Sequence, residues 1–124
     1  LVIGKGSRIG NMNHIYATGS IIIGENVLTA DKVYISDNLH SYERVDTPIL
    51  KQGIKQIKGV KVGSGTWLGE NVVVLGAHIG RNCVIGANSV VTRDIPDYSV
   101  AVGSPATVIK RFCFQTNSWI PHRE

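Results

Sequence analysis

Cysteine is scarce in this chain, whose 124 residues contain only Cys83 and Cys113. The two cysteines form no metal-ligand spacing, and nothing about them requires an oxidising compartment. Cys83 falls on a small inward position of the repeat described below, where a free thiol packs as a small hydrophobe. Cysteine chemistry is therefore not expected to carry the function.

Long apolar runs and a dense basic face are also missing. No stretch of about eighteen apolar residues could span a bilayer, and no signal peptide is recognisable. The net charge of +4 is a mild excess, and the two Trp, four Tyr and two Phe are scattered rather than gathered for stacking on bases. We therefore expect a soluble cytoplasmic protein without membrane insertion or a nucleic-acid partner. A phosphate-bearing small molecule suits this charge better.

The chain is rich in a six-residue repeat. Between Val60 and Ile95, branched apolar residues recur in steps of six, six, five, six and six. Neither a helical period of about 3.6 residues nor strand alternation gives this spacing, whereas a parallel β-helix does, with one repeat for each flat side of a coil. The apolar positions are Val62, Leu68, Val74, Ile79, Ile85 and Val91, and glycine follows at Gly63, Gly69, Gly80 and Gly86.

Each repeat has two inward positions and one corner. The branched residue fills the prism, and glycine suits the tight bend that follows because it lacks a Cβ. Three sides give a coil of about eighteen residues, and stacked coils rise by about 4.8 Å. A β-sandwich is the alternative, but sandwiches do not keep a six-residue period. The second inward positions, four residues after the first, hold Thr66, Val72, Cys83 and Ser89.

Residues 1–37 keep the period but change phase. One frame contains Ile3, Ile9, Ile15, Ile21, Val27 and Val33, and the other contains Ile23, Thr29 and Ile35, with Val27, Val33 and Leu39 as its second inward positions. The frames meet in residues 11–20, which are either a tolerated irregularity or a polar patch that faces a ligand. Because a β-helix without a cap leaves an open end, we expect a capping segment before Leu1.

Two segments depart from the repeat. Residues 40–59 form a long excursion, and such loops are usually functional or disordered. The lysines of this excursion and the nearby Lys61 either attract an anionic ligand or keep the loop solvated. They are Lys51, Lys55, Lys58 and Lys61. The second is the C-terminal extension, residues 97–124. Pro96, just before it, and Pro105 within it are expected to forbid further regular strand pairing. Residues 103–106 are expected to form a tight turn. The last stretch is expected to lie over the end of the prism as a short helix or strand, through Phe112, Phe114 and Trp119.

With these positions assigned, the chain resembles the hexapeptide-repeat acetyltransferases of the galactoside, maltose and xenobiotic group, nearest to the bacterial sugar or capsule O-acetyltransferases. The resemblance is carried by ISDNLHSYE (35–43), PILKQG (48–53), residues 66–96, and SVAVGSPATVIK (99–110). It implies a single all-β domain over residues 1–124, folded as a left-handed parallel β-helix. It also implies a homotrimer with active sites between subunits, acetyl-CoA as co-substrate without a metal, and a carbohydrate acceptor.

The resemblance places the catalytic histidine where the chain leaves the coil, at His40. The repeat agrees, because with Ile35 and Leu39 inward, His40 falls at a corner and points outward. Histidine, with an ordinary pKa of about 6.5, suits a general base near neutral pH. It would take the proton of an acceptor hydroxyl while that oxygen attacks the thioester carbon directly. Asp37, Glu43 or a main-chain carbonyl would orient it, and a backbone N–H would stabilise the oxyanion.

The resemblance also implies a set of binding residues. Those matched to coenzyme A are Trp67, Gly86, Ala87, Thr92, Arg93, Gly103, Pro105 and Lys110, and those matched to the acceptor are Asn11, Asn13 and Tyr42. Two features depart from the family. The step from Val74 to Ile79 is five residues and lacks a proline–glycine pair, which leaves the cofactor path there open. Leu39 stands where capsule-type relatives often have a polar residue.

Three other readings stay open. A zinc hydratase on the same fold would need three converging histidines, and His14, His40 and His78 are irregularly placed for that. A non-catalytic trimeric β-helix module would explain the repeat but not His40, Trp67 and the turn at residues 103–106 together. An N-acetyltransferase acting on an amino sugar or a sugar nucleotide would keep the enzyme and change the acceptor.

Overall fold

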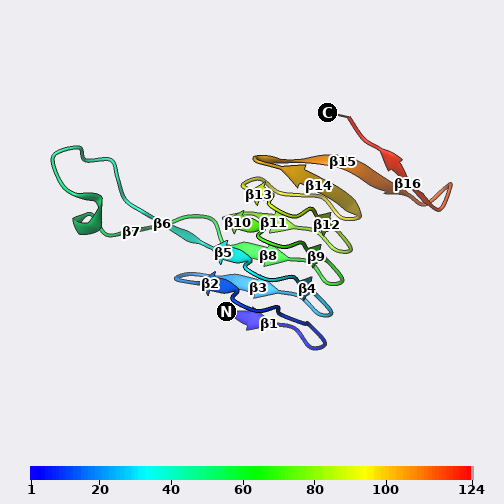
Figure 1. Ribbon diagram of the computed structural model, residues 1–124, viewed down its shortest axis with the longest axis horizontal. Helices are drawn as coiled ribbons and strands as arrows, with labels where there is room; N and C mark the ends of the chain where they lie inside the picture. The colour runs from blue at the N-terminus through cyan, green and yellow to red at the C-terminus, as the bar shows by residue number, and fades with distance from the viewer. Residues whose placement is uncertain (124) are drawn as a thin grey trace.

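The computed structural model describes residues 1–123, so Glu124, the last residue of the predicted extension, lies outside the described residues. Three parallel sheets form the three sides of a triangular prism (Figure 1). Sheet A has the order β1 (Val2–Ile3), β3 (Ile21–Ile23), β8 (Val60–Val62) and β11 (His78–Ile79). Sheet C has the order β2 (His14–Tyr16), β5 (Tyr34–Ser36), β10 (Val73–Leu75) and β13 (Val90–Val91).

Sheet B, the third side, is extended by the C-terminal strands. Its order is β4 (Leu28–Thr29), β9 (Trp67–Leu68), β12 (Val84–Ile85), β14 (Ser99–Gly103), β15 (Ala106–Cys113) and β16 (Ser118–Pro121). The strands of the prism are parallel, whereas β14, β15 and β16 pair antiparallel. No helix in residues 1–123 is long and apolar enough to cross a membrane.

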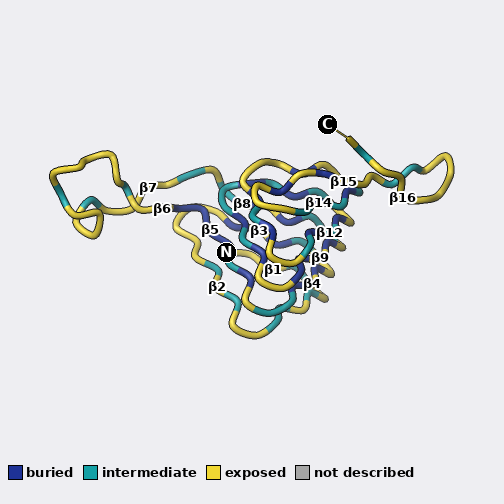
Figure 2. Tube along the Cα trace, turned by 45° about the horizontal axis from the view of Figure 1, so that its top comes forward, coloured by how far each residue is buried: buried dark blue, intermediate teal, exposed yellow. Residues whose placement is uncertain are grey.

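The inward positions predicted between Val62 and Val91 are buried, which confirms the hexapeptide pattern there (Figure 2), whereas Ile3 in the first coil is 44% exposed. From Val62 to Val91, both sets of inward side chains are at most 2% exposed. The polar members link one coil to the next. The Thr66 hydroxyl donates to the carbonyl of Gly80 at 2.8 Å, and the Ser89 hydroxyl accepts the N–H of Gly103 at 3.1 Å. Small hydroxyl residues therefore fit the core because each finds a partner inside it.

The five-residue step is absorbed at one corner. Leu75 still pairs with Ser36, and His78 still pairs with Lys61, so the register is kept on both sides of the step. Between them Gly76 has a φ of +53°, a conformation that favours glycine. The irregularity thus shortens one corner between sheets C and A without disturbing either sheet.

The phase change is narrower than residues 11–20. Ile3 pairs with Ile23 and Ile15 pairs with Ile35, so the first coil belongs to the same frame as the second. The additional residues lie between β2 and β3, in the turn at 17–20. Ile21 is buried six residues after Ile15, but the residue in register with Ile3 is Ile23, eight residues after Ile15, so the turn contains two additional residues.

The excursion is an ordered hairpin, here called the arm (residues 38–57). Strand β6 (Asn38–His40) pairs antiparallel with β7 (Ile54–Gln56), and one 3-10 turn, η1 (Ile49–Lys51), lies between them. The arm projects away from the prism (Figure 1). The prediction that Leu39 is an inward position was wrong, because the chain leaves the coil at Asn38 and Leu39 is 40% exposed on β6. His40 consequently lies on a hairpin strand rather than at a corner of the prism.

The C-terminal extension also differs from the prediction. Strand β14 still pairs parallel with β12, so the prism continues beyond residue 97. The tight turn predicted at residues 103–106 is present, with Gly103 paired to Ala106 across it. Strand pairing continues beyond Pro96 and Pro105. Pro105 permits this because it lies in the turn, where its missing N–H removes no hydrogen bond between strands. Two further strands continue sheet B, since β15 pairs antiparallel with β14 and β16 pairs antiparallel with β15.

Candidate active site

His40 opens onto a pocket between the arm and the outer face of sheet C. The pocket has a volume of about 330 Å³ and is lined by His14, Tyr16, Tyr34, Asn38, Leu39, His40 and Ile54. It joins the first two coils to both strands of the arm. The predicted histidine thus sits in a pocket large enough for a ligand group.

Two aromatic residues, His14 and Tyr34, line the pocket with His40, and the repeat pattern did not predict this proximity. His14 and Tyr34 pair across sheet C, and their rings meet edge to face with centroids 5.2 Å apart. A frame with Ile15 opposite Ile35 would have placed His14 beside Tyr34 on the outer face. The predicted frame, in which Ile21 follows Ile15, does not give the pairing of His14 with Tyr34, because it does not account for the additional residues at 17–20.

Neither predicted carboxylate bonds to His40. Glu43 accepts the Lys55 ammonium at 3.3 Å and the N–H of Tyr42 at 3.0 Å. Asp37 is fully buried and accepts hydrogen bonds from the turn at 17–20 and from Asn38. Burial alone would raise the pKa of Asp37, but these bonds outweigh it and hold the pKa well below its usual range. Both carboxylates are therefore engaged elsewhere.

Trp67 lies on the outer face of sheet B in a second pocket. This pocket has a volume of about 380 Å³, and Trp67 is 47% exposed. Its aromatic lining is Trp67, Tyr98, Phe112, Phe114 and Trp119. The Phe112 ring meets those of Trp119 and Phe114 at centroid distances of 5.4 and 4.9 Å. The extension was expected to contact the end of the prism, but its aromatic residues gather beside Trp67 instead.

The other residues matched to coenzyme A are spread along the prism. Gly86 directly follows β12, and its N–H donates to the carbonyl of Ala101 at 3.0 Å. A Cβ there would lie 2.8 Å from the Val102 side chain, so packing alone already favours glycine. The remaining residues of the set are exposed at corners, in the turn or on β15, namely Ala87, Thr92, Arg93, Gly103, Pro105 and Lys110.

The residues matched to the acceptor are also spread over the molecule rather than gathered in one pocket. The Asn13 side-chain amide donates to the carbonyls of Asn11 and Ala30, at 3.2 and 3.0 Å, and so holds a corner of the prism. Its Oδ1 atom is buried without a hydrogen-bond partner among the described residues. Tyr42 is 64% exposed on the arm, outside the lining of the His40 pocket.

His40 and Trp67 are not brought together within one chain. The arm leaves the prism after sheet C, whereas Trp67 lies on sheet B beside the C-terminal hairpin, which projects on the opposite side (Figure 1). The two pockets share no lining residue. Within one chain, the predicted residues His40 and Trp67 therefore lie in separate pockets.

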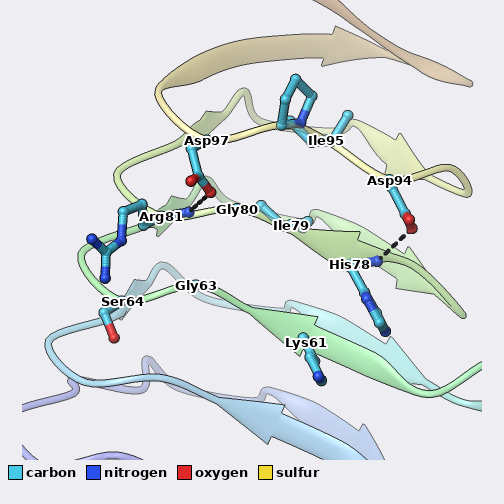
Figure 3. A pocket seen from close by; sticks show the side chains of 11 residues that line it. Lys61, Gly63, Ser64, His78, Ile79, Gly80, Arg81, Asp94, Ile95 and Asp97 are labelled. Atoms are coloured by element: carbon cyan, nitrogen blue, oxygen red, sulfur yellow. Dashed lines mark hydrogen bonds between the residues drawn. The ribbon is translucent and has the colours of Figure 1, made fainter.

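A hollow larger than either of these pockets lies over sheet A (Figure 3). It has a volume of about 530 Å³ and is open to solvent. Lys61 and His78 point into it, and Asp94 accepts the backbone N–H of His78 at 2.9 Å. None of the predicted site residues lines it. Size alone therefore does not identify the site, and we place it by its chemistry.

Within one chain, the three histidines considered for a zinc centre lie in two different pockets. His14 and His40 share one pocket, but His78 lies in another. Within residues 1–123, no group of three or more histidine, cysteine, aspartate or glutamate side chains is arranged to hold a metal ion. The three histidines that a hydratase would need do not converge.

Known proteins resemble the chain over most of its length. The family described as the hexapeptide repeat of succinyl-transferase matches residues 59–93. The chain is 37% identical over 119 residues to the putative lipopolysaccharide biosynthesis O-acetyl transferase WbbJ of Escherichia coli K12, covering 90% of this chain and 61% of that protein. The chain carries the hexapeptide repeat and is similar to acetyltransferases that share it. Its prism is the left-handed parallel β-helix of that family.

Two further similar proteins show how much of this chain, and how much of each relative, is covered by the similarity. A probable acetyltransferase of Mycobacterium tuberculosis, Rv3034c, is 48% identical over 104 residues, which is 82% of this chain and 34% of that protein. A galactoside acetyltransferase structure in complex with coenzyme A is 27% identical with a TM-score of 0.71, covering 92% of this chain and 66% of that one. The chain thus spans 34% and 61% of the lengths of the two curated relatives.

Proposed function

We propose that the protein is an acetyl-CoA-dependent O-acetyltransferase that transfers an acetyl group to a hydroxyl of a sugar or polysaccharide. The observation that carries the proposal is His40, which the arm holds in a pocket lined by His14, Tyr16 and Tyr34, with no carboxylate among the described lining residues. Relatives named as lipopolysaccharide and galactoside O-acetyltransferases support the acceptor class. The bound coenzyme A of the galactoside enzyme supports the donor. Since acetyl-CoA is a cytoplasmic metabolite, the enzyme would act in the cytoplasm.

The chemistry is a direct transfer. His40 accepts the proton of the acceptor hydroxyl as its oxygen attacks the thioester carbon, and the thiolate of coenzyme A leaves. A covalent cysteine intermediate does not fit. Burial raises the pKa of the Cys83 thiol, which donates to the carbonyl of Pro96 at 3.1 Å. A hydrogen bond involving Thr116 lowers the pKa of Cys113, but Cys113 lines neither pocket.

The complete site forms between subunits of a homotrimer. His40 and Trp67 lie in separate half-sites, so a heterologous ring, in which each arm reaches the sheet B face of the next copy, unites them. The arm is apolar enough for such a contact, since Leu39, Ile54 and Leu50 are 40%, 49% and 84% exposed. Trp67 then lies near the reacting end of acetyl-CoA.

The remaining matched residues take supporting roles. Arg93 and Lys110 are exposed cations suited to the phosphates of coenzyme A. The other cofactor positions, proposed to lie along the pantetheine arm, are Gly86, Ala87, Thr92, Gly103 and Pro105. Asn11, Asn13 and Tyr42 are proposed to contact the acceptor.

Replacement of the base tests the proposal. His40→Ala should lower turnover on the order of 10²–10⁴-fold, as loss of a general base does, and leave acetyl-CoA binding intact. His78→Ala, a histidine outside both pockets, is the matched control and should keep wild-type turnover. Acetyl-CoA consumption is measured against a panel of sugars, amino sugars, sugar nucleotides and capsular oligosaccharides. Unchanged turnover in His40→Ala would refute the assignment, and preference for amino sugars would assign N-acetylation.

A further inference from the structure

We propose that Asp37 is a positioning residue for His40, acting by fastening the base of the arm to the first coil. The proposal rests on the proposed function, in which His40 is the base. Asp37 stands at the point where the chain leaves the prism, three residues before His40. It is fully buried, although it bonds to none of the reacting groups.

Both carboxylate oxygens of Asp37 hold the turn at 17–20. Oδ1 accepts the backbone N–H of Thr18 at 2.9 Å and its hydroxyl at 3.1 Å. Oδ2 accepts the backbone N–H groups of Gly19 and Ser20 at 2.7 and 2.8 Å. Oδ1 also accepts the side-chain amide of Asn38, the first residue of the arm, at 3.0 Å. A carboxylate that accepts several N–H groups is held in one orientation by charge-assisted bonds.

The returning strand of the arm joins the same cluster. The main-chain carbonyl of Asp37 accepts the N–H of Ile57 at 2.9 Å and the side-chain amide of Gln56 at 2.7 Å. The Thr18 hydroxyl also lies 2.8 Å from Oε1 of Gln56, so the turn contacts both ends of the arm. Asp37 therefore ties together three segments that are far apart in the sequence.

This cluster sets the direction of the arm. Strands β6 and β7 pair only with each other, in a two-stranded sheet that is separate from the three sides of the prism. The arm is thus aligned with the prism through its base. A small rotation there would displace His40, and misplacement of a catalytic group by about 1 Å can lower a rate on the order of 10²-fold.

Other aspartates of the prism make a simpler contact. Asp97 accepts the backbone N–H of Arg81 from the coil below at 2.9 Å, and its side chain is exposed. It resembles Asp37 in chemistry but lies away from the arm and from both pockets of the proposed site. Asp97→Asn is therefore the matched control for Asp37→Asn.

The test compares these variants in two backgrounds. Asp37→Asn should lower kcat on the order of 10²-fold at an unchanged KM for acetyl-CoA, because the cofactor residues lie on the prism. Asp97→Asn should keep the wild-type kcat. In the His40→Ala background, Asp37→Asn should cause no further loss, since its effect passes through His40. Trypsin should also cut at Arg44 and Lys51 in the arm of Asp37→Asn faster than in the control.

Each other outcome overturns the proposal. If Asp37→Asn lowers turnover by the same factor in the His40→Ala background as in the wild type, Asp37 acts on general stability alone. Equal kcat values for Asp37→Asn and Asp97→Asn would lead to the same conclusion. If Asp37→Asn does not fold, Gln56→Met, which removes the bond from the returning strand, should still lower kcat on the order of 10-fold. A wild-type kcat in Gln56→Met would then reject the role. Full turnover in His40→Ala alone would instead reject the proposed function.

Discussion

At the scale of single residues, buried hydrogen bonds make Asp37 the most consequential side chain that sequence periodicity could not identify. The repeat predicts which side chains point inward, because that depends on neighbours six residues away. It is silent on Asp37, whose partners at 18–20 and 56–57 follow no period. His40 could be predicted from its motif, whereas its neighbour His14 could not until the two-residue change of frame was known.

Acid should reveal the contribution of Asp37 to stability. Its pKa is lower in the folded protein than in the unfolded chain, where it is about 3.9, so the ionised carboxylate stabilises the fold above that pH and loses this effect as the pH falls below it. At pH 7, Asp37→Asn should lower the free energy of unfolding by about 3 kcal/mol. The difference from wild type, measured by urea unfolding, should shrink between pH 5 and pH 3. A constant difference would contradict the assignment.

Close coil stacking makes Gly63 a second sensitive residue. A Cβ at this corner would meet the main chain of Gly80 in the next coil, where no side chain can move aside. Gly63→Ala should therefore lower the free energy of unfolding by about 2–4 kcal/mol. Gly53→Ala is the control, because it has open space around it and only a positive φ of +86°, which costs about 1 kcal/mol. Equal urea midpoints for the two variants would contradict this account.

At the scale of elements, the strands of the prism were predictable and the two hairpins were not. The inward positions from Val62 to Val91 follow from local sterics, and the structure confirms them. The arm was predicted as a loop, because the pairing of Leu39 with Lys55 depends on how the base is tied rather than on a hydrophobic pattern. The aromatic residues around Trp67 also escaped prediction, since side chains on an antiparallel extension follow no six-residue period.

The arm should be separable from the prism. A corner between sheets C and A elsewhere needs only Gly76 and Ala77, between β10 and β11. Replacing residues 37–60 with Gly-Ala, so that Ser36 is joined to Lys61 as Leu75 is joined to His78, should therefore give a folded prism with a β-type circular dichroism spectrum and a lower Tm, because the turn at 17–20 loses its acceptors. Turnover should fall to background, since His40 is removed. Retained turnover would place the catalytic group on the prism.

At the scale of the whole molecule, the proposed homotrimer would bring His40 of one copy to Trp67 of the next. Sheet B offers Trp67 and sheet C with the arm offers His40, so a closed ring of three copies contains three complete sites. Sedimentation velocity should accordingly give a particle of three times the 13.4 kDa chain mass. A monomer with full activity would contradict the assembly.

Mixed subunits test the shared site directly. His40→Ala and Trp67→Ala chains each lack one half-site, so each homotrimer should be nearly inactive. Co-expressed in equal amounts, they should recover about one quarter of wild-type activity, because that fraction of the interfaces in a cyclic trimer joins two intact half-sites. Mixing His40→Ala with itself at the same total concentration is the control. Absence of recovery would place both residues in the same subunit's site.

The insertion of the arm has a consequence for how such enzymes diversify. The chain leaves the prism after β5 and re-enters at β8, and β8 still pairs in register with β3 of the coil below. The register of the coils is therefore indifferent to what lies between residues 38 and 57, provided that the base stays tied. Arms of other lengths and sequences should therefore fit here as cassettes, and under the proposed function such an exchange would change the acceptor while the proposed cofactor residues on the prism stay the same.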